Sequence, residues 1–331
     1  MPHELADRPE PGSADAAVVT TMLALRAHHR GGPETLVLEN APVPRPAPGE
    51  ALIEVWAAAI TATELSWDLS WTTRDGTDRT PVIPSHEVSG IVIELGGGAA
   101  APAVGSEVYG LIDFDRNGAA AEYVTVPAAD LALHPRSVRH VDAAALPLAA
   151  LTAWQALVDH AQVAPGERVL VHGGAGGVGA YAVQLATLLG AHVIATGTAA
   201  QAEFIAGLGA STVIDFTTTT FTDVVSDLDV VIDTVGGATL DASFTVIRPA
   251  GRLVTLAAPP SQELADASGV TATFFVVRPD TDELTHLAEL VDGGQLLPVV
   301  AGTFPLADGR AAFEFAATQL RPGKTVLVVR E

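Results

Sequence analysis

The sequence predicts an α/β protein in which a doubly wound parallel sheet is inserted into a β-rich domain. A glycine-rich turn joins a short apolar strand to a helix over residues 168–189. Strands and helices alternate between about residues 147 and 277, whereas short strands with frequent turns fill residues 22–145. The first rhythm is typical of a parallel α/β sheet, and the second of a small barrel or sandwich. The 331 residues, 48% of them hydrophobic, suffice for about two domains.

The N-terminal residues 1–21 are expected to form a flexible tail. Proline and acidic residues (Pro2, Glu4, Asp7, Pro9) are spread through this segment, so it lacks the basic-then-apolar design of a secretory signal. No apolar run approaches the ~18 residues that span a bilayer. We therefore expect a cytoplasmic protein.

The overall charge is strongly negative, because 17 Lys and Arg face 39 Asp and Glu, which gives a formal net charge of −22. Such a surface repels phosphate backbones and anionic lipids. It argues against nucleic acid and membrane partners and leaves a small-molecule substrate. The chain contains no cysteine, which excludes disulfides, thiol catalysis and cysteine-ligated metal sites.

The β-rich segment contains four clear strand patterns separated by turn signals. Pro46 to Gly49, Gly96 to Gly98 and Asn117–Gly118 supply the turns. The predicted strands cover residues 50–57, 88–95, 106–111 and 121–126. We expect a small barrel or sandwich here.

The glycine-rich turn follows the strand predicted at 168–171 and opens the helix predicted at 178–189. Gly174, Gly176 and Gly179 satisfy the G-x-G-x-x-G pattern in that setting. They would allow a tight turn, close approach of a pyrophosphate and close helix–strand packing, respectively. The phosphates would lie at the helix N-terminus, so Gly177 and Val178 join the predicted cofactor contacts. The alternative is a turn that only permits close packing.

Strand–helix alternation continues after this turn. Strands are predicted at 192–196, 212–216, 229–235, 252–257 and 273–277, and helices at 201–208 and 238–247. This pattern predicts a Rossmann domain. The last predicted elements are a helix at 281–291, a strand at 298–306, a helix at 308–318 and a strand at 324–329. They are expected to rejoin the first domain, because a doubly wound sheet of six strands is already complete.

Several motifs together resemble the medium-chain dehydrogenase/reductase superfamily, in its zinc-independent, quinone-oxidoreductase-like branch. They are PSHEVSG at 84–90, GAAAEYV at 118–124, ALPLAALTAWQAL at 145–157, HGGAGGVG at 172–179, IDTVGG at 232–237 and GKTVL at 323–327. The resemblance covers nearly all of residues 22–330. It implies a GroES-like catalytic domain (22–146 and 278–331) interrupted by a Rossmann NADP-binding domain (147–277), with the active site in the cleft between them. It also implies a homodimer, commonly paired through Rossmann edge strands, for which residues 271–277 are a candidate unless the chain itself buries them.

The second Rossmann strand indicates which nicotinamide cofactor is used. NAD sites usually place an acidic residue about twenty positions after the glycine turn, but here no carboxylate appears before Glu203. Thr196 and Thr198 could instead donate hydrogen bonds to a 2′-phosphate, which favours NADPH over NADH. The basic residue that relatives often carry after this strand is missing, and the two threonines could simply form a turn.

The family match supplies further cofactor contacts. Thr152 is expected near the nicotinamide. Val235, Leu256 and Ala257 are expected to line the cofactor cleft. Phe274 and Phe275 are expected to flank the nicotinamide end. Each apolar member of this set could equally be plain core.

A catalytic zinc is not expected. Zinc enzymes of this superfamily use two cysteines and a histidine, and here Thr61 and Leu148 stand at the cysteine positions while His86 is retained. A threonine hydroxyl is a poor zinc ligand. The less favoured alternative is a site built from His86, Glu87 and Glu64.

Without a metal, hydrogen-bond donors must polarise the substrate, and Thr61 and Thr63 are the predicted catalytic residues. Trp67, Trp71 and Phe114 would form an aromatic pocket wall, or else belong to the core. We expect NADPH-dependent hydride transfer to a quinone or to the C=C bond of an α,β-unsaturated carbonyl. The alternatives are reduction of a ketone or aldehyde, and a non-catalytic NADPH-binding protein.

Overall fold

The computed structural model describes residues 20–99, 102–318 and 321–331. Most of the predicted tail therefore lies outside the described residues. Its last residue, Thr21, opens strand β1 (Thr21–Ala27), which pairs antiparallel with β2 (Leu36–Pro42). Within the described residues, no helix is both long and apolar enough to cross a membrane.

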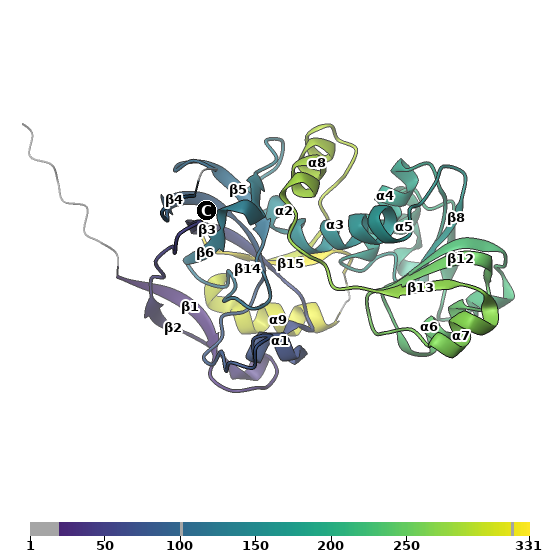
Figure 1. Cartoon of the computed structure of the whole chain (residues 1–331), viewed down its shortest axis with the longest axis horizontal. Helices are drawn as coiled ribbons and strands as arrows, with labels where there is room; N and C mark the ends of the chain where they lie inside the picture. Colours follow the sequence, from purple (N-terminus) through teal and green to yellow (C-terminus); the bar gives the residue numbers. More distant parts are fainter. Residues whose placement is uncertain (1–19, 100–101, 319–320) are drawn as a thin grey trace, which may run out of the picture.

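The molecule is elongated, with a β-rich part at one end and a parallel sheet at the other (Figure 1). The β-rich part is a seven-stranded sheet in the order β14-β15-β3-β4-β5-β7, with β6 paired to β3. Its strands are β3 (Glu50–Ile60), β4 (Glu87–Leu95), β5 (Glu107–Leu111), β6 (Tyr123–Pro127), β7 (Leu131–Leu133), β14 (Val300–Pro305) and β15 (Lys324–Val328).

The C-terminal strands β14 and β15 belong to this first sheet. Strand β15 pairs antiparallel with β3, and Thr325 lies opposite Ile60. This register brings Lys324 beside the carboxyl end of β3. Residues that are more than 260 positions apart in the chain thus meet at one edge of the β-rich part.

The second sheet has six parallel strands in the order β10-β9-β8-β11-β12-β13. This is the 3-2-1-4-5-6 order of a dinucleotide-binding fold, so the doubly wound prediction is confirmed. The strands are β8 (Arg168–Val171), β9 (His192–Gly197), β10 (Thr212–Asp215), β11 (Leu228–Asp233), β12 (Ile247–Thr255) and β13 (Thr271–Phe274).

Two boundary predictions in this sheet are wrong. The last strand was expected at 273–277, but β13 covers Thr271–Phe274 and ends three residues earlier. Residues up to 247 were expected to be helical, but the helix ends at Ser243 and Ile247 already belongs to β12. The strand is irregular near its start, where Ala250 has a φ of 62°. A break of this kind interrupts the regular apolar pattern by which a strand is recognised.

Nine α-helices occur in the described residues, and α3 links the two parts in Figure 1. It continues as a π-helix over Gln155–His160. The α-helices are α1 (Asp68–Trp71), α2 (His140–Ala144), α3 (Pro147–Trp154), α4 (Gly179–Leu188), α5 (Ala202–Gly207), α6 (Gly237–Ser243), α7 (Gln262–Ser268), α8 (Thr281–Asp292) and α9 (Gly309–Thr318).

One hydrophobic core is continuous across the two parts. It joins Tyr109 and Phe114 of the β-rich part to Leu151 of α3 and Val171 of β8. The Tyr109 hydroxyl donates a hydrogen bond to the Leu284 carbonyl of α8 at 2.5 Å. The two sheets are therefore held in one relative position by buried contacts rather than by a loose linker alone.

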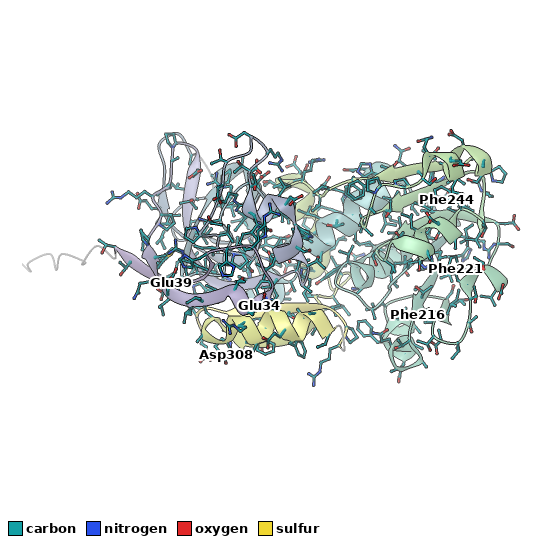
Figure 2. The ribbon with its side chains drawn as sticks, turned by 90° about the horizontal axis from the view of Figure 1, so that it is seen from below. Glu34, Glu39, Phe216, Phe221, Phe244 and Asp308 are labelled. Atoms are coloured by element: carbon teal, nitrogen blue, oxygen red, sulfur yellow. The ribbon has the colours of Figure 1, made fainter. Side chains whose placement is uncertain are left out.

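The parallel-sheet end carries both buried and exposed aromatic rings (Figure 2). Phe244 is buried in that end's own core, whereas Phe216 is 60% exposed just after β10. The Phe216 backbone N–H donates to the Gly197 carbonyl at 3.2 Å. An apolar ring thus lies beside the carboxyl ends of β9 and β10, where ligands of such sheets bind.

Candidate active site

The glycine turn between β8 and α4 is closed so tightly that side chains would not fit. A Cβ added at Gly179 would lie 2.1 Å from the Gly173 carbonyl oxygen, and one at Gly174 would lie 2.9 Å from the Ala195 Cβ. The Gly174 N–H donates to the Thr196 carbonyl at 2.8 Å. Glycine at 174 and 179 is therefore a steric requirement of the helix–strand contact.

The outer side of the same turn is open. Gly176 is exposed, and a Cβ there would meet only the Gly173 carbonyl oxygen, at 3.2 Å. Among the described residues, the N–H groups of Gly177, Val178 and Gly179 find no hydrogen-bond acceptor. Free N–H groups at the start of a ten-residue helix form a site for phosphate oxygens.

Lys324 connects this turn to the β-rich part, and sequence reasoning missed it. The Gly323 N–H donates to the Ala175 carbonyl at 3.1 Å. The aliphatic stem of Lys324 runs beneath the turn, where a Cβ on Gly177 would lie 3.0 Å from its Cδ. The side chain is only 6% exposed. Composition carried a signal: of the 17 basic residues, 16 are arginine and this is the single lysine.

The Lys324 ammonium group has two partners from the β-rich part. Its Nζ lies 2.5 Å from Oε2 of Glu87 and donates to Oγ1 of Thr61 at 2.9 Å. Oε1 of Glu87 accepts a hydrogen bond from the Leu148 N–H at 3.0 Å. Burial raises the pKa of Glu87, while Lys324 opposes that rise. The predicted catalytic Thr61 thus belongs to a buried charged cluster of Lys324 and Glu87.

A second buried carboxyl group, Glu64, fixes the loop that carries Thr61. Its Oε1 accepts from the Thr61 N–H at 3.3 Å, and its Oε2 accepts from the Ser85 N–H at 2.9 Å. Burial raises the pKa of Glu64 to about 7, against the opposing effects of the Ser85 N–H and Lys324. Glu64 is therefore a backbone anchor as well as a titrating group.

The residues at the family's zinc positions do not fit a zinc ion. At two of them, the Thr61 hydroxyl is held by the Lys324 ammonium group and Leu148 offers only an apolar side chain. The described residues contain no cluster of three or more His, Asp or Glu placed to hold a metal. A cation placed between Thr61 and Glu87 would also meet the positive charge of Lys324.

His86 is buried against Phe114, with ring centroids 5.1 Å apart. Burial and the nearby Arg79 charge lower the pKa of His86 to about 4. Its Nδ1 is buried and has no hydrogen-bond partner in the described part of the chain. The neutral ring thus packs among apolar neighbours beside the loop that carries Thr61.

Of the three aromatic residues predicted for the pocket wall, two lie together. Trp67 contacts Phe114 edge-on, with ring centroids 5.5 Å apart. Trp71 is 2% exposed in the core of the β-rich part, and its indole N–H donates to the Leu65 carbonyl at 2.8 Å. Trp71 therefore belongs to the core, the alternative left open by the sequence. Thr63 is exposed, and its carbonyl, not its hydroxyl, accepts from Ser66 at 2.6 Å.

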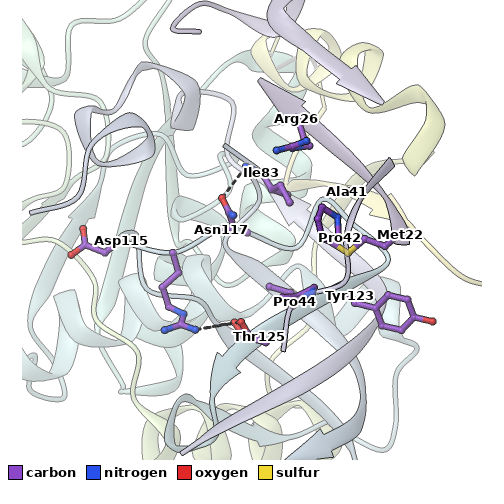
Figure 3. Close-up of a pocket in the computed structure, with 13 residues that line it drawn as sticks. Met22, Arg26, Ala41, Pro42, Pro44, Ile83, Asp115, Asn117, Tyr123 and Thr125 are labelled. Carbon is purple, nitrogen blue, oxygen red and sulfur yellow. Dashed lines mark hydrogen bonds between the residues drawn. The ribbon is translucent and has the colours of Figure 1, made fainter. Parts of the chain in front are cut away.

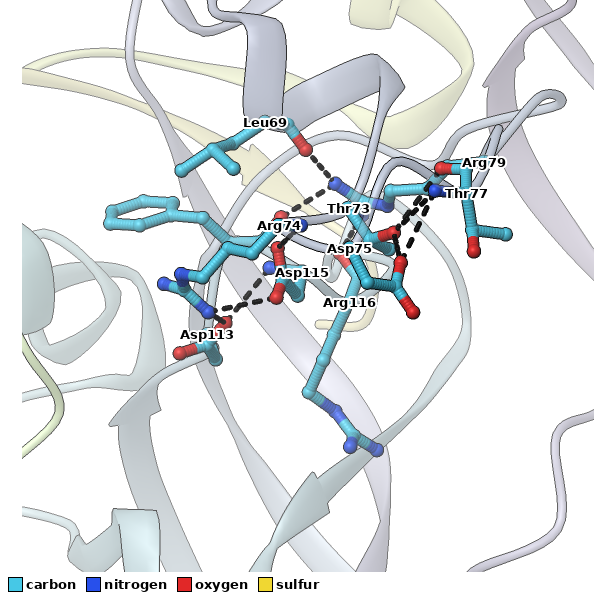
Figure 4. Close-up of polar contacts among 10 residues, drawn as sticks. Leu69, Thr73, Arg74, Asp75, Thr77, Arg79, Asp113, Asp115 and Arg116 are labelled. Carbon is cyan, nitrogen blue, oxygen red and sulfur yellow. Dashed lines mark hydrogen bonds and ion pairs between the residues drawn. The ribbon is translucent and has the colours of Figure 1, made fainter.

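Two arginines hold the loop that carries Phe114 (Figure 4). Arg79 donates to the carbonyls of Leu69, Phe114 and Arg116, the Phe114 bond measuring 2.5 Å. Arg74 pairs with Asp113 and Asp115, each at 2.9 Å. The segment after α1 thus fixes the segment that presents the Phe114 ring.

The threonines predicted to contact a 2′-phosphate have partners inside the chain. Oγ1 of Thr196 accepts from the Gly173 N–H at 3.0 Å and lies 3.4 Å from Nδ1 of His172. Thr198 forms a capping box with Gln201, whose Oε1 accepts from the Thr198 N–H at 3.0 Å. An accepting hydroxyl keeps its own hydrogen, so the predicted phosphate contacts stay predictions.

The residues predicted to line the cofactor cleft gather at the carboxyl edge of the parallel sheet. Asp233 accepts from the N–H groups of Val235 and Gly236 and from the Thr255 hydroxyl. The Val235 side chain itself is 54% exposed. The Leu256 N–H donates to the Asp233 carbonyl at 3.0 Å. Ala257 follows, and its Cβ would lie 2.8 Å from a Cβ on Gly236.

The remaining predicted contacts lie on either side of this edge. The Thr152 hydroxyl donates to the Leu148 carbonyl at 2.5 Å, one turn back in α3. Phe274 pairs in register with Thr255 and is 38% exposed. The Phe275 ring lies on His160, with centroids 4.3 Å apart. Their proposed contacts with a cofactor stay predictions.

A separate pocket of about 440 Å³ lies within the β-rich part (Figure 3). Met22, Arg26, Asn117 and Tyr123 are among its lining residues. None of the lining residues belongs to the glycine turn or the Lys324 cluster. The pocket therefore lies apart from the candidate site.

Two protein-family models match the chain. One, described as the alcohol dehydrogenase GroES-like domain, covers residues 47–136, and one described as zinc-binding dehydrogenase covers residues 208–327. The second description names zinc, to which the donor set above is unsuited.

Individual relatives span nearly the whole chain. The chain is 33% identical over 334 residues to an NADPH-dependent alkenal/one oxidoreductase of Arabidopsis thaliana, a chloroplastic protein, covering 95% of this chain and 81% of the relative. It matches the quinone oxidoreductase from Coxiella burnetii with a TM-score of 0.87 and 29% identity, covering 94% of this chain and all of the other. A mycobacterial protein solved in complex with NADPH matches with a TM-score of 0.81 and 30% identity, covering 93% and 100% of the two chains.

Proposed function

Because the chain belongs to the medium-chain dehydrogenase/reductase superfamily, we propose that it is an NADPH-dependent oxidoreductase that reduces the C=C bond of an α,β-unsaturated carbonyl compound or a quinone. The observation that carries this proposal is the meeting of the glycine turn with Thr61 through Lys324. The glycine turn and the Thr61 hydroxyl are thereby held at one boundary between the two sheets, which supports a site for a cofactor phosphate and a substrate at that boundary.

The residues of the chain divide the work of such a reaction. The free N–H groups of Gly177 and Val178 would hold the pyrophosphate of the cofactor. The hydride is supplied by bound NADPH. The Thr61 hydroxyl would donate to the carbonyl oxygen of the substrate, where negative charge develops. Trp67 and Phe114 would keep water away from the reacting carbon.

The choice between C=C and C=O reduction rests on the charge of the cluster. Hydride addition to a ketone puts full negative charge on one oxygen, which zinc enzymes neutralise with the metal. Here the donors are a hydroxyl and a lysine already paired with Glu87. An enolate or quinol anion delocalises its negative charge, so it needs less stabilisation from these donors than the localised charge formed from a ketone does.

We also propose that the protein works in the cytoplasm. We propose further that it forms a homodimer joined along β13, because proteins of this family commonly pair through an edge strand of the Rossmann sheet. The exposed Val276, at 57%, follows that edge strand and would be covered by a second copy. Light scattering tests the assembly: a mass near twice the 33.9 kDa of one chain is expected.

The test of the function is consumption of NADPH, followed by its absorbance, with a panel of enones, quinones and ketones. We expect turnover with enones or quinones, weaker turnover with ketones, and a lower KM for NADPH than for NADH. Gly176→Val should abolish cofactor binding by filling the open side of the turn. Tight NADPH binding without turnover of any acceptor would favour the non-catalytic alternative.

A further inference from the structure

We propose that Lys324 polarises the Thr61 hydroxyl, so that the two residues act as one donor to the anionic oxygen formed on the substrate. Lys324 is the positioning residue in this pair, and Thr61 is the group that touches the substrate. The proposal rests on the function proposed above and names how its site stabilises charge. It assigns a role to a side chain that sequence reasoning did not single out.

The direction of the hydrogen bond follows from the chemistry of the two groups. A lysine ammonium group has three donors and no acceptor. In the 2.9 Å contact between Nζ of Lys324 and Oγ1 of Thr61, the threonine oxygen must therefore accept. Its own hydrogen is left for another acceptor, and a hydroxyl that accepts from a cation becomes a stronger donor.

The position of Lys324 is fixed from three sides. Its stem lies beneath Gly177, and the adjacent Gly323 is bonded to Ala175 of the turn. Its Nζ is held 2.5 Å from the buried carboxylate of Glu87. A side chain that is 6% exposed and this constrained has little freedom to leave Thr61.

The other side of Thr61 is fixed as well, because Glu64 accepts from its backbone N–H. Thr61 itself is partly exposed, unlike Glu64, Glu87 and Lys324. It is therefore the member of the cluster that a substrate can reach. Its hydroxyl can pass the effect of the buried charge to the substrate without exposing the charge to water.

The reduction uses the hydride of NADPH, which leaves NADP⁺, and a proton from water, which leaves hydroxide. The hydride adds to the β-carbon, the C=C electron pair moves toward the carbonyl, and the oxygen becomes an enolate. The Thr61 hydroxyl donates to that oxygen and keeps its proton. Water then protonates the α-carbon, which regenerates the carbonyl group.

The test uses para-nitrophenol as an enolate mimic, titrated into protein saturated with NADP⁺. Its phenolate and neutral forms are distinguished by absorbance. The wild type should prefer the phenolate, because a hydrogen bond to a charged oxygen is stronger than one to a neutral oxygen. Lys324→Met and Thr61→Val should each weaken phenolate binding at least about tenfold, and the double variant should lose little more. The control Arg321→Met removes an exposed charge three residues away and should bind as the wild type does.

A second readout needs no ligand. Because Lys324 is the single lysine, protein labelled with [¹⁵N]lysine gives one side-chain ammonium signal. Thr61→Val should shift this signal, whereas Thr303→Val, at an exposed threonine on β14, should not. No shift in Thr61→Val would overturn the proposal.

The outcomes separate the two proposals. Failure of the wild type to reduce any enone or quinone would sink the proposed function, while the phenolate titration would still decide the role of Lys324. Wild-type protein without phenolate preference, Lys324→Met with unchanged preference, or fully additive losses would each overturn the Lys324–Thr61 pair.

Discussion

The two sides of the candidate site are built from different materials. On the parallel-sheet side, the turn at Gly173–Gly179 offers backbone N–H groups, whose positions are set by the absence of side chains. On the β-rich side, Thr61, Glu64, Glu87 and Lys324 offer hydroxyl and charged groups that are largely buried. The first side is thus sensitive to added volume, and the second to removed charge.

The largest effect is expected on the charged side. Glu87→Gln leaves the Lys324 ammonium group without the carboxylate at 2.5 Å. Breaking one member of a buried pair costs about 3–5 kcal/mol of stability. The control Asp68→Asn breaks the exposed Arg30–Asp68 pair and should cost less than about 1 kcal/mol. Urea unfolding measures both. Equal losses in the two variants would contradict this distinction, and the Lys324→Met/Glu87→Gln double variant should recover part of the loss.

The next largest effect is expected on the parallel-sheet side, where the glycine turn offers backbone N–H groups. Gly179→Ala places a Cβ 2.1 Å from the Gly173 carbonyl oxygen, so the turn must shift. Overpacking costs about 1–3 kcal/mol, and about 1.4 kcal/mol corresponds to tenfold in affinity. NADPH affinity should therefore fall roughly tenfold or more, measured by fluorescence titration. Gly207→Ala, where a Cβ meets nothing within 4 Å, should leave affinity unchanged. Retained affinity in Gly179→Ala would show that the turn tolerates volume.

The two sides also differ in how far the sequence alone predicts them. The glycine spacing and the apolar run before it predicted a strand at 168–171, and β8 covers these same residues. This prediction was possible because the strand, the turn and the helix are adjacent in the chain. The Lys324–Thr61 contact joins residues 263 positions apart, and no periodicity encodes such a meeting. The family match pointed to Thr61 as a catalytic residue, but it did not point to Lys324, which donates a hydrogen bond to Thr61.

A similar limit explains the threonines near β9. Sequence reasoning assigned Thr196 to a 2′-phosphate because no carboxylate follows the strand. In the structure its hydroxyl accepts from the Gly173 N–H instead. A small hydroxyl can bond in several directions, and which bond it makes depends on the neighbouring turn rather than on the strand pattern.

A prediction of intermediate size concerns the pocket wall. Arg79→Met removes donors to three carbonyls that hold the Phe114 loop. The ring should become mobile, so the KM for an enone should rise about tenfold while NADPH affinity stays near wild type; charged hydrogen bonds contribute about 1.5–3 kcal/mol each. Arg74→Met removes a half-exposed arginine from the same segment as Arg79 and should change KM less. A larger effect from Arg74→Met would reverse our assignment of the two arginines.

A smaller effect concerns the pH dependence of stability on the parallel-sheet side of the site. Burial lowers the pKa of His172, next to the glycine turn, to about 4. Its unfolded value is about 6.5, so the unfolded state binds the proton first as pH falls. The stability that His172 contributes is present above about pH 6.5 and is lost toward pH 4, by about 1.4 kcal/mol per pH unit. His172→Gln should flatten the acid slope of urea stability by that amount, and an unchanged slope would contradict the buried neutral state. Asp233, which faces His172, remains in both proteins.

The smallest expected effect is that of metal removal. The family description names zinc, but at this site the charge that would polarise a substrate is provided by Lys324 through Thr61. A divalent cation would have to displace that ammonium group from Glu87 and Thr61, and Leu148 would give it nothing in return. Chelator treatment should therefore leave kcat and the unfolding midpoint unchanged, and elemental analysis should find well under one zinc per chain. If the protein instead contained one equivalent of zinc and lost its activity when that zinc was removed, the cluster would have to reorganise around the metal. Lys324 would then occupy the place of the metal only in the metal-free protein.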